Sequence, residues 1–191
     1  MINLKPDNRT FQTHTFINEK VEEALKAIEY PNMATVQIIY NMFRHKPAEK
    51  FFDLAKNQNV GIIARVPLAS GMLTGKFDMD TVFSKGDHRY YNREGQAFDK
   101  GETFSGVPYE VGLEAVEELK KIFPQERLAE YALRWILMND NVSCIIPGAS
   151  RVSQVEDNIK ASDLPPLTGD QMKAVDEIYQ RYVKKYVHDL W

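Results

Sequence analysis

The chain has 191 residues, of which 43% are hydrophobic and 27% charged, and it carries a net charge of −3. This composition predicts a single globular domain over residues 1–191, and the lack of a basic excess argues against nucleic-acid or anionic-membrane partners. The N-terminus has no signal-like apolar run, and no stretch approaches the roughly 20 apolar residues of a membrane helix, so we expect a cytoplasmic protein without membrane association.

Three short apolar runs predict strands over residues 36–40, 60–66 and 142–147. They lack strict alternation, which is typical of parallel strands covered on both faces. The only cysteine, Cys144, lies in the third run, where we expect a buried packing residue. The segment 10–16 is a weaker candidate for a fourth strand, because its apolar and polar residues alternate poorly.

Segments of helical period separate and follow these strands. Asn18 is placed to cap the first helix, and Thr168 with Gln171 forms a capping-box pair before the last. The alternation of strands and helices indicates an α/β fold with a parallel sheet and right-handed crossovers. The predicted helices cover residues 18–28, 47–55, 111–122, 128–136, 152–159 and 168–186.

A long segment, residues 67–108, is rich in Gly, Asp, Arg and Tyr, and segments of this length are usually lids or binding loops. A parallel sheet of so few strands has two open edges and needs cover on both faces. We therefore expect another copy of the chain, or a partner chain, to cover these edges. A rearrangement toward a flavodoxin-like sandwich is the alternative.

The sequence PLASGMLTGK at residues 67–76 follows the second predicted strand. Its small residues allow backbone amides to approach a phosphate, and Lys76 adds a positive charge. The spacing argues against a P-loop, because only three residues separate Gly71 from Gly75 and Phe77 stands where a P-loop has Ser or Thr.

The sequence IPGASRVSQVEDN at residues 146–158 follows the third predicted strand. Gly148 opens a turn, Ser150 or Ser153 can cap the helix, and Arg151 carries a charge suited to a phosphate monoester. The residues alone also allow a plain capped helix with a solvated polar face. That polar face carries Gln154, Asp157 and Asn158.

Residues 67–77 and 146–158 together resemble the paired signature of the aldo/keto reductase family, and residues 30–52 resemble its sixth strand and following helix. The resemblance extends over residues 18–191, whereas residues 1–17 diverge. It implies a partial (β/α)8 TIM barrel, a half barrel of parallel strands with flanking helices and a C-terminal helix. It also implies NADP(H)-dependent reduction of an aldehyde or ketone.

The same resemblance assigns residues to parts of NADP(H). Gln37 corresponds to the contact with the nicotinamide carboxamide, and Arg89 is a weaker candidate for a lid contact. The loop under the pyrophosphate corresponds to Val66, Pro67, Leu68, Ala69 and Ser70, with Lys76 as its cationic neighbour. The adenosine 2′-phosphate and adenine contacts correspond to Gly148, Ser150, Arg151, Gln154, Asp157 and Asn158.

Arg65 departs from the family pattern, because many members have an aromatic residue there that stacks on the nicotinamide. An arginine plane can also stack, but it places a positive charge beside a ring that is cationic when oxidised. If Arg65 faces the ring, we expect it to disfavour NADP⁺ relative to NADPH.

No catalytic residue is assigned. The family's Asp, Tyr, Lys and His tetrad, in which Tyr is the general acid, belongs to the other half of the barrel. The four histidines lack metal-ligand spacing, so no metal site is expected. Three interpretations remain open: a reductase represented by its cofactor-binding half, a non-catalytic module that binds NADP(H) or assembles with a partner, and a truncated fragment.

Overall fold

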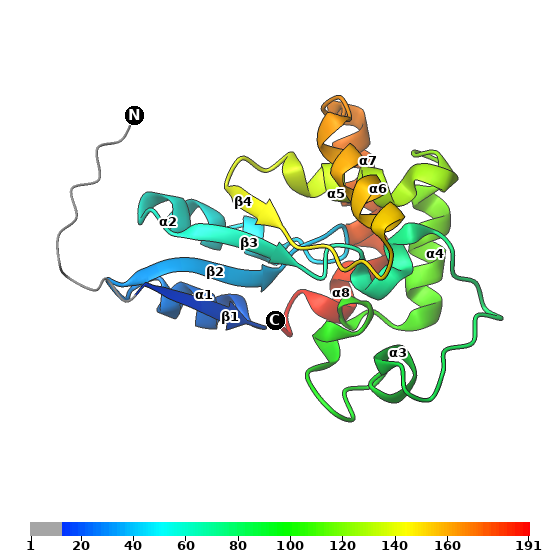
Figure 1. The fold of residues 1–191 in the computed structure, drawn as a ribbon, viewed down its shortest axis with the longest axis horizontal. Helices are drawn as coiled ribbons and strands as arrows, with labels where there is room; N and C mark the ends of the chain where they lie inside the picture. Colours follow the sequence, from blue (N-terminus) through cyan, green and yellow to red (C-terminus); the bar gives the residue numbers. More distant parts are fainter. Residues whose placement is uncertain (1–12) are drawn as a thin grey trace.

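The computed structural model describes residues 13–191. Four parallel strands form one sheet in the order β1-β2-β3-β4 (Figure 1). The three predicted strands are confirmed with shifted ends. The fourth is also present, displaced toward the C-terminus from the predicted 10–16, of which residues 10–12 lie outside the described residues. The strands are β1 (His14–Asn18), β2 (Met33–Ile39), β3 (Gly61–Arg65) and β4 (Val142–Ile145).

The longer helices match the predicted segments. The capping box at Thr168 is confirmed, because its hydroxyl accepts from the Gln171 amide. The cap at Asn18 is wrong: Asn18 ends β1, and Lys20 directly precedes the first helix. The helices are α1 (Val21–Ala27), α2 (Phe51–Asn57), α3 (His88–Tyr91), α4 (Tyr109–Leu119), α5 (Leu128–Leu137), α6 (Val152–Asp163), α7 (Gly169–Ile178) and α8 (Lys184–Val187), with a π-helical turn at Tyr179–Val183 between α7 and α8.

Residues 67–108 are more ordered than the sequence predicted. Beside α3, this segment contains three 3-10 turns, at Ala69–Thr74, Lys100–Glu102 and Phe104–Gly106. Across residues 13–191, no helix has both the length and the apolar character required to cross a membrane.

The sheet is covered on one face. Helices α1 and α2 contact each other as well as their strands, so both lie on the same side of the sheet. On that side Val36, Ile38 and Ile62 are at most 1% exposed. On the other side Ile17 is 60% exposed. Sequential strand order with one covered face is the geometry of part of a barrel, so the flavodoxin-like alternative is wrong.

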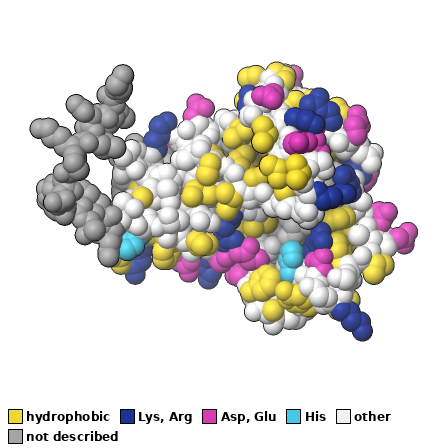
Figure 2. Space-filling model, viewed as in Figure 1, with side chains coloured by type: hydrophobic (Ala, Val, Ile, Leu, Met, Phe, Trp, Pro, Cys, Tyr) yellow, Lys and Arg dark blue, Asp and Glu magenta, His cyan; other side chains and the backbone are white. Residues whose placement is uncertain are grey.

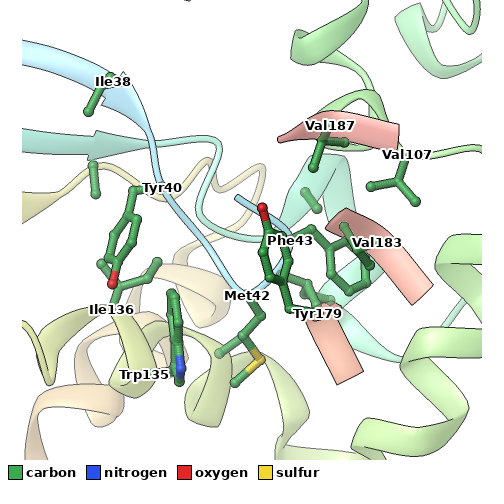
Figure 3. Close-up of a cluster of buried hydrophobic side chains, with 14 of the residues drawn as sticks. Ile38, Tyr40, Met42, Phe43, Val107, Trp135, Ile136, Tyr179, Val183 and Val187 are labelled. Carbon is green, nitrogen blue, oxygen red and sulfur yellow. The ribbon is translucent and has the colours of Figure 1, made fainter. Parts of the chain in front are cut away.

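The hydrophobic core continues beyond the carboxyl end of β2 (Figure 3). Tyr40 packs on Trp135 of α5, with ring centroids 5.0 Å apart. Met42 and Phe43 are both 1% exposed and belong to the same cluster as Tyr179. The segment after β2 is therefore anchored between α5 and the C-terminal helices.

The edge formed by β4 and α6 is apolar and open. The apolar face of α6 points outward, with Val152, Val155 and Ile159 exposed by 75%, 48% and 61%. Figure 2 shows hydrophobic side chains over this part of the surface. Cys144 on β4 is also exposed, so its predicted burial is wrong: no further strand covers β4 within residues 13–191.

His45 generates a prediction about stability. It is stacked between Trp135 and Tyr179, at centroid distances of 4.7 and 3.9 Å. Burial lowers the pKa of His45 from 6.5 to about 4. Since the unfolded chain then binds a proton that the folded chain excludes, the contribution of His45 to the free energy of unfolding should be highest above pH 6.5. This contribution should fall by on the order of 3 kcal/mol as the pH drops toward 4.

Urea unfolding at pH 7 and pH 5 measures this effect. His45→Gln should lower stability at both pH values and flatten the pH dependence, whereas His14→Gln, at the exposed start of β1, should leave the dependence unchanged. Equal pH dependence in wild type and His45→Gln would contradict the assignment.

Candidate functional site

Strands β3 and β4 are adjacent and parallel, so the turns that follow them meet at one edge of the sheet. Residues 66–71 after β3 and residues 146–151 after β4 face each other across a cleft of about 740 Å³. The start of α5 and residues from α3 close its sides. Topology thus brings together two segments that are about 80 residues apart in the sequence.

The turn after β3 has an unusual backbone. Val66, Ala69 and Ser70 have positive φ angles of 50°, 47° and 56°, followed by Gly71 at 95°. Left-handed backbone costs roughly 1–2 kcal/mol for each residue other than glycine, and it persists where surrounding contacts hold it. One such contact is the Ser70 hydroxyl, which donates to the Glu102 carbonyl at 2.9 Å.

The turn after β4 differs from the prediction. Neither Ser150 nor Ser153 caps α6, because Arg151 is the capping position and its side chain makes no capping bond. Instead the side-chain oxygen of Gln154 accepts from the Ser150 backbone amide at 2.7 Å and from its hydroxyl at 3.1 Å. Gln154 therefore holds the turn rather than presenting its carbonyl oxygen to the cleft.

Several charges at the cleft are already compensated. Arg127 pairs with Glu130 at 2.6 Å, and Asp157 pairs with Lys160 at 2.7 Å. Arg89 pairs with Asp87, and the hydrogen bond from Arg89 lowers the pKa of that carboxyl to about 2.

Two cations of the cleft remain. Within residues 13–191, neither Lys76 nor Arg151 forms an ion pair, and both are exposed. Each of the two motifs that line the cleft therefore contributes one positive charge that has no ion-pair partner within the described residues. This arrangement suits a ligand that carries separate anionic groups.

Most predicted cofactor residues line the cleft, and three do not. Those that line it are Val66, Pro67, Leu68, Ser70, Lys76, Arg89, Gly148, Ser150, Arg151, Gln154, Asp157 and Asn158. Ala69 is fully buried beneath the turn, Arg65 is buried beside it, and Gln37 is half-buried on β2.

Further residues that the sequence did not predict also line the cleft. Gly71, Thr74 and Phe77 lie within or next to the first motif, and Ile146 and Ala149 lie within the second. The others come from elements that carry no motif, and tertiary packing alone brings them in: His88, Glu102, Glu126, Arg127, Ala129 and Glu130.

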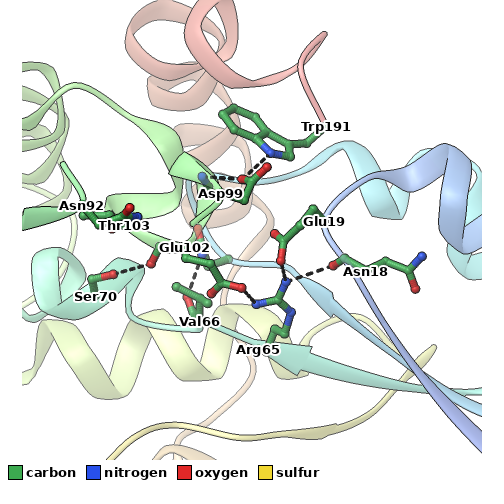
Figure 4. A network of polar contacts seen from close by, with 12 residues as sticks. Asn18, Glu19, Arg65, Val66, Ser70, Asn92, Asp99, Glu102, Thr103 and Trp191 are labelled. Atoms are coloured by element: carbon green, nitrogen blue, oxygen red, sulfur yellow. Dashed lines mark hydrogen bonds and ion pairs between the residues drawn. The ribbon is translucent and has the colours of Figure 1, made fainter. Parts of the chain in front are cut away.

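Arg65 lies in a buried ionic network (Figure 4). Its guanidinium contacts the carboxylates of Glu19 and Glu102 and donates to the Asn18 carbonyl at 3.0 Å. Burial, together with a hydrogen bond to Glu102, raises the pKa of Glu19 to about 7. Two carboxylates therefore contact the Arg65 guanidinium and compensate its positive charge within the protein.

Within the described chain, no tyrosine lines the cleft. Tyr40 is 4% exposed in the core, and burial raises its pKa to about 12. Tyr90 and Tyr91 lie on α3 and are exposed. A general acid must lie within reach of the reacting atom, and these three tyrosines lie outside the cleft.

Comparisons with known proteins agree with this architecture. The model of the aldo/keto reductase family matches residues 12–180. A probable voltage-gated potassium channel beta subunit of Arabidopsis thaliana is 35% identical over 150 residues, which cover 76% of this chain and 44% of the relative. The L-glyceraldehyde 3-phosphate reductase of Escherichia coli is 29% identical over 162 residues, covering 83% and 45%. The chain spans less than half the length of these relatives.

Solved structures match in the same way. A glycerol dehydrogenase of Gluconobacter oxydans is 30% identical with a TM-score of 0.61, covering 79% of this chain and 43% of the other. An aldo-keto reductase of Bacillus halodurans, in its holo form, shares the fold at 20% identity and a TM-score of 0.59, covering 87% and 50%. The four-stranded sheet therefore corresponds to part of a (β/α)8 barrel, and the chain belongs to the aldo/keto reductase family.

Proposed function

We propose that this chain is the NADP(H)-binding half of an aldo/keto reductase-like oxidoreductase. The observation that carries the proposal is the cleft between the β3 and β4 turns, with Lys76 and Arg151 free of ion pairs within the described residues. Its volume of about 740 Å³ lies within the range, roughly 300–1,000 Å³, typical of small-molecule sites. Bound NADPH supplies a hydride to the carbonyl carbon of an aldehyde or ketone.

The residues of the cleft fit the parts of this cofactor. Arg151 offers a planar fork of donors to the 2′-phosphate, and Ser150 lies beside it. The Val66–Ser70 turn and Lys76 hold the pyrophosphate, because the folded-back backbone permits a close approach. Asn158 and the amide nitrogen of Gln154 face the adenine end.

The nicotinamide end lies toward the open face of the sheet in this proposal. Gln37 pairs in register with Ile17 on β1 and Ile63 on β3, so its side chain shares their face. Ile17 on that face is 60% exposed. Gln37 is thus available to the carboxamide although it does not line the cleft.

The chain's own contribution is to bind and orient the cofactor. No tyrosine of the described residues is placed to supply the proton that carbonyl reduction requires. We therefore propose that reduction needs a tetrad-bearing half from another polypeptide or polypeptide segment. Without it, the chain acts as a non-catalytic NADP(H)-binding module.

Arg151→Ala tests the cofactor assignment. Losing a charge-assisted bidentate contact is expected to weaken NADPH binding about tenfold to 100-fold, while the affinity for NADH, which lacks the 2′-phosphate, changes little. Quenching of the dihydronicotinamide fluorescence, titrated separately for NADPH and for NADH, gives the two dissociation constants. The control is Arg181→Ala, which removes the same charge from an exposed site outside the cleft. An equal loss for both nucleotides, or no binding by wild type, would contradict the proposal.

We also propose that a second barrel half covers the open sheet. Apolar side chains are exposed near both edges of the sheet. Ile17 lies on β1 at one edge, and Val155 and Ile159 lie on α6, which follows β4 at the other edge. Unpaired strand edges and exposed apolar stripes favour association. With the pure protein, the half available for this pairing is a second copy of the chain.

Ile17→Lys tests the association. Placing a charge on this face should weaken self-association of the purified chain about tenfold or more, since a buried ammonium loses its hydration. Sedimentation velocity over a range of concentrations measures the effect. Leu190→Lys is the matched control, because Leu190 is also 60% exposed but lies outside the sheet. A wild-type chain that stays monomeric at every concentration would overturn this part of the proposal.

A further inference from the structure

Two left-handed turns lie against each other behind the cleft. The first is the strained turn after β3, with Val66 at a φ of 50° and Ser70 at 56°. The second has Phe104, Ser105 and Gly106 at 51°, 59° and 81°. A β-branched residue such as Val66 rarely adopts this conformation, so some contact must hold it there.

The contact is the side chain of Asn41, two residues beyond the end of β2. Asn41 is fully buried. Its amide nitrogen donates one hydrogen bond to the Val66 carbonyl and one to the Ser105 hydroxyl, each at 2.8 Å. Its oxygen accepts from the backbone amide of Phe43 at 2.8 Å. The three bonds satisfy both protons of the amide and fix its orientation.

The second turn is also anchored to the body of the protein. Arg44 donates to the Ser105 carbonyl at 3.1 Å, and its guanidinium stacks on the Trp191 ring at 4.0 Å. Asn41 and Arg44 both follow β2, and their neighbours Tyr40, Met42 and Phe43 are buried in the hydrophobic core. The chain of contacts therefore runs from the core through Asn41 to the carbonyl of Val66.

We infer that Asn41 is a positioning residue for cofactor binding, which holds Val66 in its left-handed conformation and so shapes the turn for a pyrophosphate. The inference rests on the proposed function. Asn41 itself does not line the cleft, and of the parts of the cofactor only the pyrophosphate depends on it. The adenosine 2′-phosphate end, held at Ser150 and Arg151, lies on the other turn and is independent of Asn41.

Two ligands distinguish the contribution of the turn after β3 from that of the turn after β4. NADPH engages both turns, whereas adenosine 2′-phosphate has no pyrophosphate and engages only the turn after β4. Asn41→Ala should bind NADPH about tenfold to 100-fold more weakly than wild type and should bind adenosine 2′-phosphate with unchanged affinity. Fluorescence quenching measures the first ligand, and an NMR shift titration measures the second.

Asn92→Ala is the matched control. Asn92 is equally buried, and its side chain bonds Thr103, Ala97 and Phe98 in the same long segment, but it does not contact the Val66 turn. It should lower stability without changing the ratio of the two affinities. Ser105→Ala is a milder variant that keeps the bond from Asn41 to Val66, and it should lower NADPH affinity less than Asn41→Ala.

Rescue distinguishes positioning from a general loss of structure. Glycine adopts positive φ without strain, so Val66→Gly should restore most of the NADPH affinity lost in Asn41→Ala. It should restore none in Asn92→Ala. If wild type binds both ligands but Asn41→Ala weakens both equally, or Val66→Gly fails to rescue, the inference is overturned and the proposed function stands. If wild type binds neither ligand, the proposed function itself is overturned, and the inference with it.

Discussion

The parallel pairing of β3 with β4 is the contact on which the candidate site depends. Parallel strands point their carboxyl ends to the same edge of a sheet, so the turns that follow them must meet. The sequential order β1-β2-β3-β4 has a second consequence (Figure 1). Helices α1 and α2 cover only one face, and within residues 13–191 no further strand pairs with the outer edge of β1 or of β4. One topology thus creates both the cleft and the surface for which we propose a partner.

Electrostatic compensation decides which charges of the site are available. Arg65 is enclosed by Glu19 and Glu102, and Arg127 is neutralised by Glu130 across a single helical turn. Burial of the Arg65 guanidinium costs hydration energy that only its close carboxylate contacts offset. Lys76 and Arg151 stay on the surface of the cleft, where their charge is retained. A count of basic residues in the motifs does not distinguish these two groups.

Much of the site was predictable, and the reasons for the failures are specific. The motifs at residues 67–76 and 146–158 were placed correctly, because strand ends and topology follow from local pattern. The contacts of Arg65 with two carboxylates were not predictable, since Glu19 and Glu102 lie 46 and 37 residues away in the sequence and no local pattern links them to Arg65. The capping by Ser150 failed for a local reason: its hydroxyl donates to the side-chain oxygen of Gln154 instead of accepting from an amide of α6. The role of Asn41 was not predicted, because a single asparagine after a strand does not form a recognisable motif.

The sequence by itself determined the class of fold, the order of strands and helices, and the two turns that carry the family signature. These features depend on residue periodicity and on near neighbours along the chain. Only the tertiary structure decided that α6 presents its apolar face outward, that Arg65 is enclosed by carboxylates, and that Asn41 ties two strained turns together. Burial and long-range hydrogen bonds depend on which distant segments meet, and local periodicity does not encode those meetings.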